Sequence, residues 1–344
     1  MMPVIVDAEN LLRRGIMASV RADARAKSYT GGMYSAFTTM SNLLRIDLRI
    51  AGPILMCFDH RGRGIKYGSG IHPERLKLLP GYKESRGEKP TIVESHEMDE
   101  AMEQVDIAFD MFQNLGVPCV RYKNREADDI IGAAVKLWLK RGHRPVVVSG
   151  DHDMLQCVAW GADVWMLNRK VLVTQDNFED EIGIPPELFL LYKALIGDKS
   201  DEIEGVKGVG EKTAKQLVMA WADQLSDEEL EDCMDVPTLQ MVLFCGWAKN
   251  QEKPKVLTTV DAQRKRLSKV IKGIDISWSF DDITTLAGAI DNPPTENLKL
   301  FAARARKYGM TGLVNKAQTH YHPVLHAARK AGDRKKSASH GKKC

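Results

Sequence analysis

The stretch Val146-Val147-Val148-Ser149-Gly150-Asp151-His152-Asp153 combines the two features that decide the fold, an apolar run of strand length and a turn that carries two acids. Apolar runs of similar length occur at residues 4–6, 54–58 and 117–122, and helical periods at 33–48, 100–115 and 127–140 separate them. Short runs without polar alternation are typical of parallel strands buried on both faces. The alternation of strand and helix therefore predicts an α/β fold with a central, mostly parallel sheet flanked by helices.

Length and composition limit the class of protein. A chain of 344 residues with 44% hydrophobic and 28% charged residues is ordinary for a globular protein of about two domains. Its longest apolar runs are far shorter than the ~20 residues of a membrane span, and its start lacks the pattern of a signal peptide. None of its six cysteines forms a C-x-x-C pair. We therefore expect an intracellular protein of the cytoplasm, without a membrane association.

The composition and hydrophobic pattern of the sequence change three times along the chain. Residues 60–95 are rich in Gly, Lys, Arg and His, and they are too long for an ordinary connection. From about residue 185 helical patterns dominate, and the last residues are strongly basic. We predict a catalytic core at 1–184 with an inserted segment at about 60–100, a helical region at 185–320 and a disordered tail at 321–344.

Acids gather at the predicted ends of strands and starts of helices, in four local clusters. The nine carboxylates are Asp7, Asp59, Glu126, Asp128, Asp129, Asp151, Asp153, Asp198 and Asp201. The spacing within each cluster can aim two carboxylates at one point, because residues three apart share a helix face and residues two apart share a strand face. In open α/β sheets the carboxyl ends of the strands are also where ligands bind.

So many like charges at short range require cations. Oxygen donors without Cys or His favour Mg²⁺, with Mn²⁺ as a substitute, and two such ions can promote phosphodiester hydrolysis. Each cluster alone also has a simpler explanation, since acids stabilise the first turn of a helix and occur in turns after strands. Four such clusters in one α/β domain favour the metal site.

The motifs as a series resemble the 5′-nuclease family, in its stand-alone form. This family includes flap endonucleases, bacteriophage 5′→3′ exonucleases and the N-terminal domain of bacterial DNA polymerase I. The resemblance covers about residues 3–220, and 344 residues leave no room for a polymerase domain. It rests on Val6-Asp7-Ala8-Glu9-Asn10, Gly81-Tyr82-Lys83-Glu84-Ser85-Arg86, Glu126-Ala127-Asp128-Asp129, Ser149-Gly150-Asp151-His152-Asp153, and Gly197-Asp198-Lys199-Ser200-Asp201 followed by a glycine-rich hairpin at 205–214.

The resemblance implies a role for each matching residue. The first metal site would comprise Asp7, Asp59, Glu126 and Asp128, and the second Asp151, Asp153, Asp198 and Asp201. Asp129 would lie near both sites and act through water. Tyr82, Lys83 and Arg86 match a helical arch through which the free 5′ end passes, and Arg75 matches an arch arginine. A compact cation such as Lys83 can stabilise charge on the scissile phosphate, and Tyr82 can stack on a base or pack the arch.

The hairpin resembles the family's helix–three-turn–helix anchor for duplex DNA. Its glycines allow a close approach of backbone to phosphate, and the next helix offers its N-terminus. The DNA-binding residues we predict are Arg14, Arg75, Gly205, Val206, Gly208, Val209, Gly210, Lys212, Thr213 and Lys215. The family also implies a K⁺ ion at the hairpin. Two acids, Glu202 and Glu204, replace the family's usual Asn and Pro.

Taken together, these features indicate a monomeric, metal-dependent 5′→3′ exonuclease and flap endonuclease that acts in DNA replication or repair. Its substrates would be DNA with free 5′ ends, flaps or nicks. Three alternatives stay open: removal of RNA primers from RNA–DNA hybrid, a non-catalytic protein that binds DNA junctions, and a small RNase. A series of RNA, DNA and chimeric 5′ ends would separate the first alternative from the main hypothesis.

The basic tail generates a prediction of its own. Residues 326–344 contain seven Lys or Arg and one acid. Deleting them should flatten the salt dependence of DNA binding, because each phosphate contact contributes roughly −0.9 to the slope of log K against log salt. Turnover at saturating DNA should not change. A large fall in saturating turnover would contradict the assignment.

Overall fold

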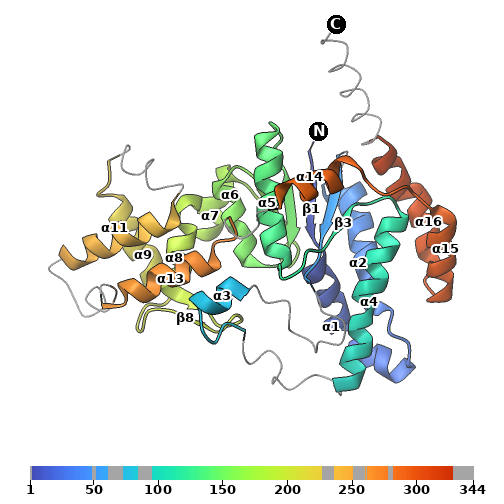
Figure 1. Ribbon diagram of the computed structural model, residues 1–344, viewed down its shortest axis with the longest axis horizontal. Coiled ribbons are helices and arrows are strands. Elements are labelled where there is room, and N and C mark those ends of the chain that lie inside the picture. Colours follow the sequence, from blue (N-terminus) through green and yellow to red (C-terminus); the bar gives the residue numbers. More distant parts are fainter. Residues whose placement is uncertain are drawn as a thin grey trace, which may run out of the picture.

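The computed structural model describes residues 2–48, 52–60, 73–83, 95–226, 236–250, 260, 262–277 and 282–327 (Figure 1). Arg86, most of the inserted segment at 60–100 and the basic residues from 328 onward lie outside the described residues. Residues 321–327, which we had assigned to the tail, are helical and packed. Tyr321 is buried there, and its hydroxyl donates to the carbonyl of Phe37 at 2.7 Å.

The centre of the fold is a six-stranded sheet in the order β3-β2-β1-β4-β5-β6, parallel except for β6. The strands are β1 (Val4–Asp7), β2 (Ile54–Cys57), β3 (Cys119–Val120), β4 (Val146–Ser149), β5 (Asp163–Met166) and β6 (Val171–Val173). The four predicted strands form, and the prediction of a mostly parallel sheet is confirmed. β5 and β6 were not predicted, because a polar residue opens the first and the second has only three residues.

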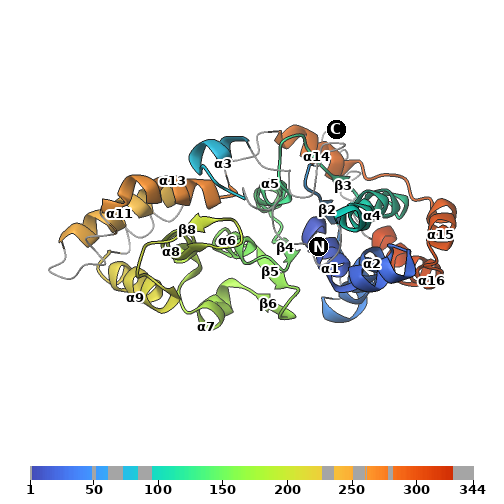
Figure 2. The ribbon, with the colours of Figure 1, turned by 90° about the horizontal axis from the view of Figure 1, so that it is seen from below.

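Helices cover both faces of the sheet. Ile5 and Val147 point to the face covered by α5 (Ala127–Lys140) and α6 (Gln156–Ala159). Their neighbours Val6 and Val148 point to the other face, against α1 (Ala8–Ala26), α2 (Gly31–Asn42) and α4 (Ser95–Asn114). Figure 2 shows these two layers on either side of the strands. Both sides of each central strand are thus buried, which explains its unbroken apolar sequence.

A helical region extends from the α5 side of the sheet. It contains α7 (Phe178–Ile182), α8 (Phe189–Ile196), the short hairpin β7–β8 (Gly197–Asp198, Ile203–Glu204), α9 (Glu211–Ala222), α11 (Pro237–Asn250) and α13 (Arg264–Ile274). The helix α3 (Pro73–Leu78) lies beside α13 in both views (Figures 1 and 2). One apolar cluster joins this region to the sheet, so the boundary at 184/185 stays a prediction.

After α13 the chain returns across the sheet. It forms α14 (Ile283–Asp291) near α5, then α15 (Leu298–Lys307) and α16 (Gly312–Lys316) on the side of α2 and α4 (Figure 1). The helices α14, α15 and α16 therefore pack against the α/β core rather than forming an appendage. No helix in the described ranges has the length and apolar character needed to cross a membrane.

Phe37 joins the returning helices to the core. Its ring stacks on Phe112 of α4 with the centroids 4.1 Å apart, and it meets Phe301 of α15 edge to face at 5.6 Å. Phe37→Ala should lower the free energy of unfolding by about 3–5 kcal/mol, the usual cost of deleting a buried aromatic ring. Urea unfolding of this variant beside Met17→Ala, an exposed position on α1, provides the measurement. An equal loss in the two variants would contradict the packing role of Phe37.

Candidate metal centre and nucleic-acid interface

The predicted acids meet at one edge of the sheet. Asp7 ends β1, Asp59 follows β2 by two residues, and Asp151 follows β4 by two. Because these three strands are parallel neighbours, their carboxyl ends lie side by side. Glu126, at the start of α5, reaches the same edge because the backbone N–H of Ala127 donates to Asp59 at 2.8 Å.

Asp7 is buried at the centre of this edge. Its carboxylate accepts hydrogen bonds from the backbone of Asn10 at 2.9 Å and from the Ser149 hydroxyl at 2.8 Å. The first bond caps α1, so the same side chain ends the strand and starts the helix. Burial raises the pKa of Asp7 to about 7, and the charges of Asp59 and Asp151 add to the rise. These three acids therefore lie within electrostatic range of one another.

Three acids of the second cluster open α5 and have different surroundings. Asp129 accepts from the backbone N–H of Glu126 at 3.1 Å, as a helix-capping residue does. The simple helix-capping explanation thus accounts for part of the role of Asp129. Asp128 is different, because burial raises its pKa well above the ordinary value and the charges of Glu126 and Asp151 add to the effect.

Arg75, on α3, holds two of these acids from the interior. Its guanidinium donates to Glu126, to Asp129 at 2.7 Å and to the carbonyl of Gly273 at 2.9 Å. Only 2% of its surface is exposed. We predicted a contact with DNA for Arg75, and in this arrangement the side chain is committed to the protein interior instead.

Lys83 and Tyr82 lie between the second and fourth acid clusters. The Lys83 ammonium is 2.7 Å from a Glu126 oxygen and 3.6 Å from an Asp201 oxygen. Its backbone has a left-handed φ of 57°, and its N–H donates to the Asp201 carbonyl at 3.1 Å. The Tyr82 hydroxyl donates to the same two acids, at 3.3 and 3.1 Å. The end of the described arch segment is therefore docked on the acids.

The charges in this group are interdependent. Burial by itself would lower the pKa of Lys83, but the charges of Glu126, Asp201 and Asp128 together with Tyr82 outweigh it, and the pKa rises well above the ordinary value. Burial would likewise raise the pKa of Glu126, but Lys83 and Arg75 hold it at about 2. Lys83 thus keeps its positive charge at neutral pH.

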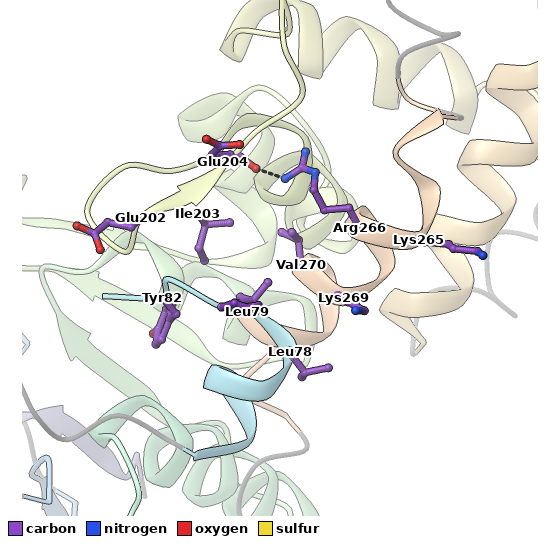
Figure 3. Close-up of a pocket in the computed structure, with 11 residues that line it drawn as sticks. Leu78, Leu79, Tyr82, Glu202, Ile203, Glu204, Lys265, Arg266, Lys269 and Val270 are labelled. Atoms are coloured by element: carbon purple, nitrogen blue, oxygen red, sulfur yellow. Dashed lines mark hydrogen bonds between the residues drawn. The ribbon is translucent and has the colours of Figure 1, made fainter. Parts of the chain in front are cut away.

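A pocket of about 470 Å³ adjoins Tyr82 on the side away from the sheet (Figure 3). Its apolar lining includes Leu78, Leu79 and Val270, and the charged side chains around it belong to residues 202 and 204 and to α13. Arg266 of α13 donates to the carbonyls of Glu204 and Gly205 at 2.5 and 3.0 Å. A guanidinium therefore already satisfies these two carbonyls beside the hairpin.

The third and fourth acid clusters share a cation that the sequence analysis missed. The ammonium of Lys193, on α8, is 2.8 Å from both Asp153 and Asp198. Burial raises the pKa of Asp153 to about 7, with Asp151 adding to the rise, whereas Lys193 and Ser200 hold the pKa of Asp198 at about 2. The only signal in the sequence was a lysine in an otherwise apolar helix, five residues before Asp198.

The donor set fits hard divalent cations. Every candidate ligand is a carboxylate, and Asp7, Asp128 and Asp153 all have raised pKa values because they are buried near other acids. The ammonium groups of Lys83 and Lys193 occupy positions between acids where a cation is favourable. Within the described ranges no three acids already surround one metal position. Binding would therefore require these ammonium groups or the acids to shift.

The predicted DNA anchor follows the fourth cluster. Gly208 has a φ of 84°, a conformation that glycine adopts without strain, and Gly210 precedes the start of α9. Val206 and Val209 are buried, whereas Gly208, Gly210 and Lys212 are exposed and Gly205 and Thr213 are half-buried. Hairpin backbone and the first turn of α9 thus face solvent together.

Two predicted DNA contacts differ in their surroundings. Arg14 is exposed on α1. Lys215 bonds to the carbonyl of Ile182, and its ammonium lies 5.8 Å from the ring centre of Tyr192. The side chain of Lys215 therefore helps to hold α9 against α7 and α8 in this arrangement.

Comparison with known proteins identifies the family of the chain. Residues 2–183 match the family model for the 5′-3′ exonuclease N-terminal resolvase-like domain. A 5′-3′ exonuclease of Halalkalibacterium halodurans is 29% identical over 239 residues, which are 67% of this chain and 73% of that protein. DNA polymerase I of Streptococcus pneumoniae is 30% identical over 309 residues, which are 86% of this chain but 32% of the polymerase.

Solved structures share the fold. A T5 5′-exonuclease structure with divalent metal ions (zinc) has a TM-score of 0.61 and 17% identity, over 95% of this chain and 100% of that one. A T5 flap endonuclease in complex with DNA and metal ions has a TM-score of 0.59 and 18% identity, over 96% and 100% of the chains. The family match covers more than half of this chain and contains the first three acid clusters. This protein belongs to the 5′-3′ exonuclease family.

Proposed function

We propose that this protein is a divalent-metal-dependent 5′→3′ exonuclease and structure-specific 5′-flap endonuclease, which hydrolyses DNA phosphodiester bonds in replication or repair. The observation that carries the proposal is the convergence of the acid clusters at one sheet edge, where Asp7, Asp128 and Asp153 have raised pKa values. A set of buried carboxylates that repel one another gains free energy when a divalent cation binds. The relatives named as 5′-3′ exonucleases support the reaction.

The two ion sites follow the grouping of the acids. Asp7, Asp59, Glu126 and Asp128 would hold one ion, and Asp151, Asp153, Asp198 and Asp201 the other, with Asp129 orienting the start of α5. Mg²⁺ or Mn²⁺ bound there supplies an activated water and neutralises charge on the leaving oxygen. The metal-bound T5 structures support this assignment by analogy.

Lys83 would stabilise negative charge on the scissile phosphate. It is a protonated ammonium between Glu126 and Asp201, one acid from each proposed ion site. A compact positive charge at this position acts on the non-bridging oxygens of the phosphate. Tyr82 would orient Lys83, since its hydroxyl bonds the same acids and its ring centre lies 4.6 Å from the ammonium. For Arg86 the resemblance implies a role in the arch.

The hairpin at 205–214 would hold duplex DNA through its backbone. The exposed glycines and the first turn of α9 offer N–H groups and the positive end of a helix dipole to phosphates. Such contacts position DNA without reading its sequence. Arg14 would add a phosphate contact near the acids, and K⁺ at the hairpin would use carbonyls other than those of Glu204 and Gly205.

Asp153 generates a prediction about pH and metal. Its folded pKa of about 7 exceeds the ordinary value, so the folded state binds this proton more tightly than the unfolded chain does. In the presence of a chelator, protonated Asp153 contributes its full stabilisation of the fold below about pH 4. This stabilisation is lost as the pH rises through about 7. Mg²⁺ should therefore raise the melting temperature more at pH 8 than at pH 5.

Asp153→Asn is the matched variant for this measurement. Asp151, Lys193 and Asp198 remain around the new amide, which cannot ionise. In chelator at pH 8 it should melt at a higher temperature than the wild type, and Mg²⁺ should shift it less. An equal Mg²⁺ shift at both pH values in the wild type would refute the assignment.

Cleavage of a 5′-flap duplex tests the function itself. We expect cutting near the junction with Mg²⁺, none in chelator, and none by Asp153→Ala although it still binds DNA. Tight binding without cutting in Mg²⁺ or Mn²⁺ would favour a junction-binding protein. A preference for RNA 5′ ends over DNA 5′ ends would favour primer removal.

Lys83→Ala tests the role of the ammonium. It should lower the cleavage rate at saturating DNA by roughly 100-fold, the usual effect of removing one group that stabilises transition-state charge. The affinity for DNA should change little. Lys77→Ala, an exposed lysine on α3, is the control and should cut like the wild type. Near-normal cutting by Lys83→Ala would rule out the electrostatic role.

A further inference from the structure

Residues 273–276, which are the last two residues of α13 and the two that follow it, lie in a part of the chain where the sequence showed no motif. They contact three elements of the acid site that are far apart in sequence: α3 with Arg75, the start of α5, and the loop that carries Asp151 and Asp153. We propose that the 273–276 segment is a positioning element for the proposed two-ion site, on which this assignment rests. The segment sets the geometry of the arch base, and of the second and third acid clusters.

The first contact fixes the arch base. The carbonyl of Gly273 accepts a hydrogen bond from Nε of Arg75 at 2.9 Å, and both atoms are buried. The other two nitrogens of this guanidinium bind Glu126 and Asp129. Gly273 also lets α3 approach closely, because a Cβ on this residue would lie 2.5 Å from the side chain of Leu79. One backbone carbonyl thus orients the arginine that joins α3 to α5.

The second contact fixes the loop of the third acid cluster. The Gln156 side chain is buried, and its amide nitrogen donates to the carbonyls of Asp153 at 2.8 Å and Ile274 at 3.3 Å. Its oxygen accepts from the backbone N–H of Ile276 at 3.0 Å. Because a buried amide that loses its partners carries a large cost, these bonds tie the 273–276 segment to the loop at 151–156.

The third contact is with α5. Gly132 lies one turn after Asp128 on this helix, so the two residues share a face. A Cβ added at Gly132 would lie 2.7 Å from the carbonyl oxygen of Ile276 and 3.3 Å from its carbonyl carbon. The helix thus touches the backbone of the segment directly, and any methyl group between them would push the two apart.

There is a physical reason why one short segment should contact all three supporting elements. Two-ion chemistry depends on the distance between carboxylates that repel one another, and a displacement of about 1 Å can cost roughly 100-fold in rate. The acids themselves cannot set this distance, because their mutual repulsion favours separation. A rigid backbone segment bonded to all three supporting elements provides the opposing constraint.

Gly132→Ala tests the proposal without removing any hydrogen-bonding group. Alanine favours the helix, so the new clash with Ile276 is the main change. The matched control is Gly246→Ala on α11, where a Cβ would meet open space. For Gly132→Ala we expect kcat on a 5′ flap to fall by roughly tenfold to 100-fold. The Mg²⁺ concentration for half-maximal rate should rise, KM for DNA should stay the same, and Gly246→Ala should match the wild type.

Hydrogen–deuterium exchange of the metal-free protein gives a readout that does not depend on activity. In Gly132→Ala, amides in 73–83 and 151–157 should exchange roughly tenfold faster, because both segments lose their common support. Faster exchange confined to 128–136 and 274–277 would overturn the proposal, as would an unchanged kcat. If the wild type cuts no DNA, the proposed function fails, and the exchange data alone decide the role of the segment.

Gln156→Met is the second variant, for the case in which Gly132→Ala does not fold. It keeps the length of the side chain and removes the three hydrogen bonds to Asp153, Ile274 and Ile276. Gln318→Met, an exposed position, is its control. We expect the same loss of kcat at constant KM. An equal effect of both methionine substitutions, or a change in KM alone, would refute the positioning role.

Discussion

Repulsion between buried carboxylates is the constraint on which the rest of this structure depends. The acids meet at one sheet edge, where Asp7, Asp128 and Asp153 are buried near other acids and have raised pKa values. Three cations of the protein offset part of this repulsion: Arg75, Lys83 and Lys193. Each of them comes from an element outside the sheet. The segments that carry these cations are therefore held in place partly by the charge that they neutralise.

This balance connects the fold to the proposed chemistry. If lysine and arginine neutralised all the acids, the site would have little affinity for a metal ion. If no lysine or arginine lay near the acids, their repulsion would destabilise the fold. Here Glu126 and Asp198 are held ionised by their partners, whereas Asp7 and Asp128 have no such full compensation. The protein thus combines acids that are already charged with acids that a divalent cation would ionise.

The helical region serves the same site from two directions. α8 supplies Lys193 and leads directly into Asp198, while the end of α13 bonds Arg75 and the loop of Asp153. The exposed hairpin at 205–214 belongs to the same helical region. A duplex bound at this hairpin would therefore be held by the elements that also position the acids, which couples DNA binding to the geometry of cleavage.

The sequence alone determined the parallel sheet, the acids at its carboxyl edge and the family. Those features depend on local patterns, since buried strands read as unbroken apolar runs and parallel strands must end at one edge. It also predicted the hairpin, in which Gly208 has a positive φ that glycine adopts without strain. The strand β6 escaped prediction because it has only three residues, and the packed helix at 321–327 because its contact with Phe37 is distant in sequence.

Only the tertiary structure decided how the charges are paired. Lys193 lies five residues before Asp198, but no local pattern pairs it with Asp153. Arg75 resembles a DNA contact in sequence, whereas in the structure it makes three internal hydrogen bonds. The contacts of residues 273–276 depend on two glycines and one glutamine from separate elements. Sequence patterns report which side chains a segment offers and which face is apolar. They do not report which of those side chains meet, because this depends on the packing of elements more than 100 residues apart.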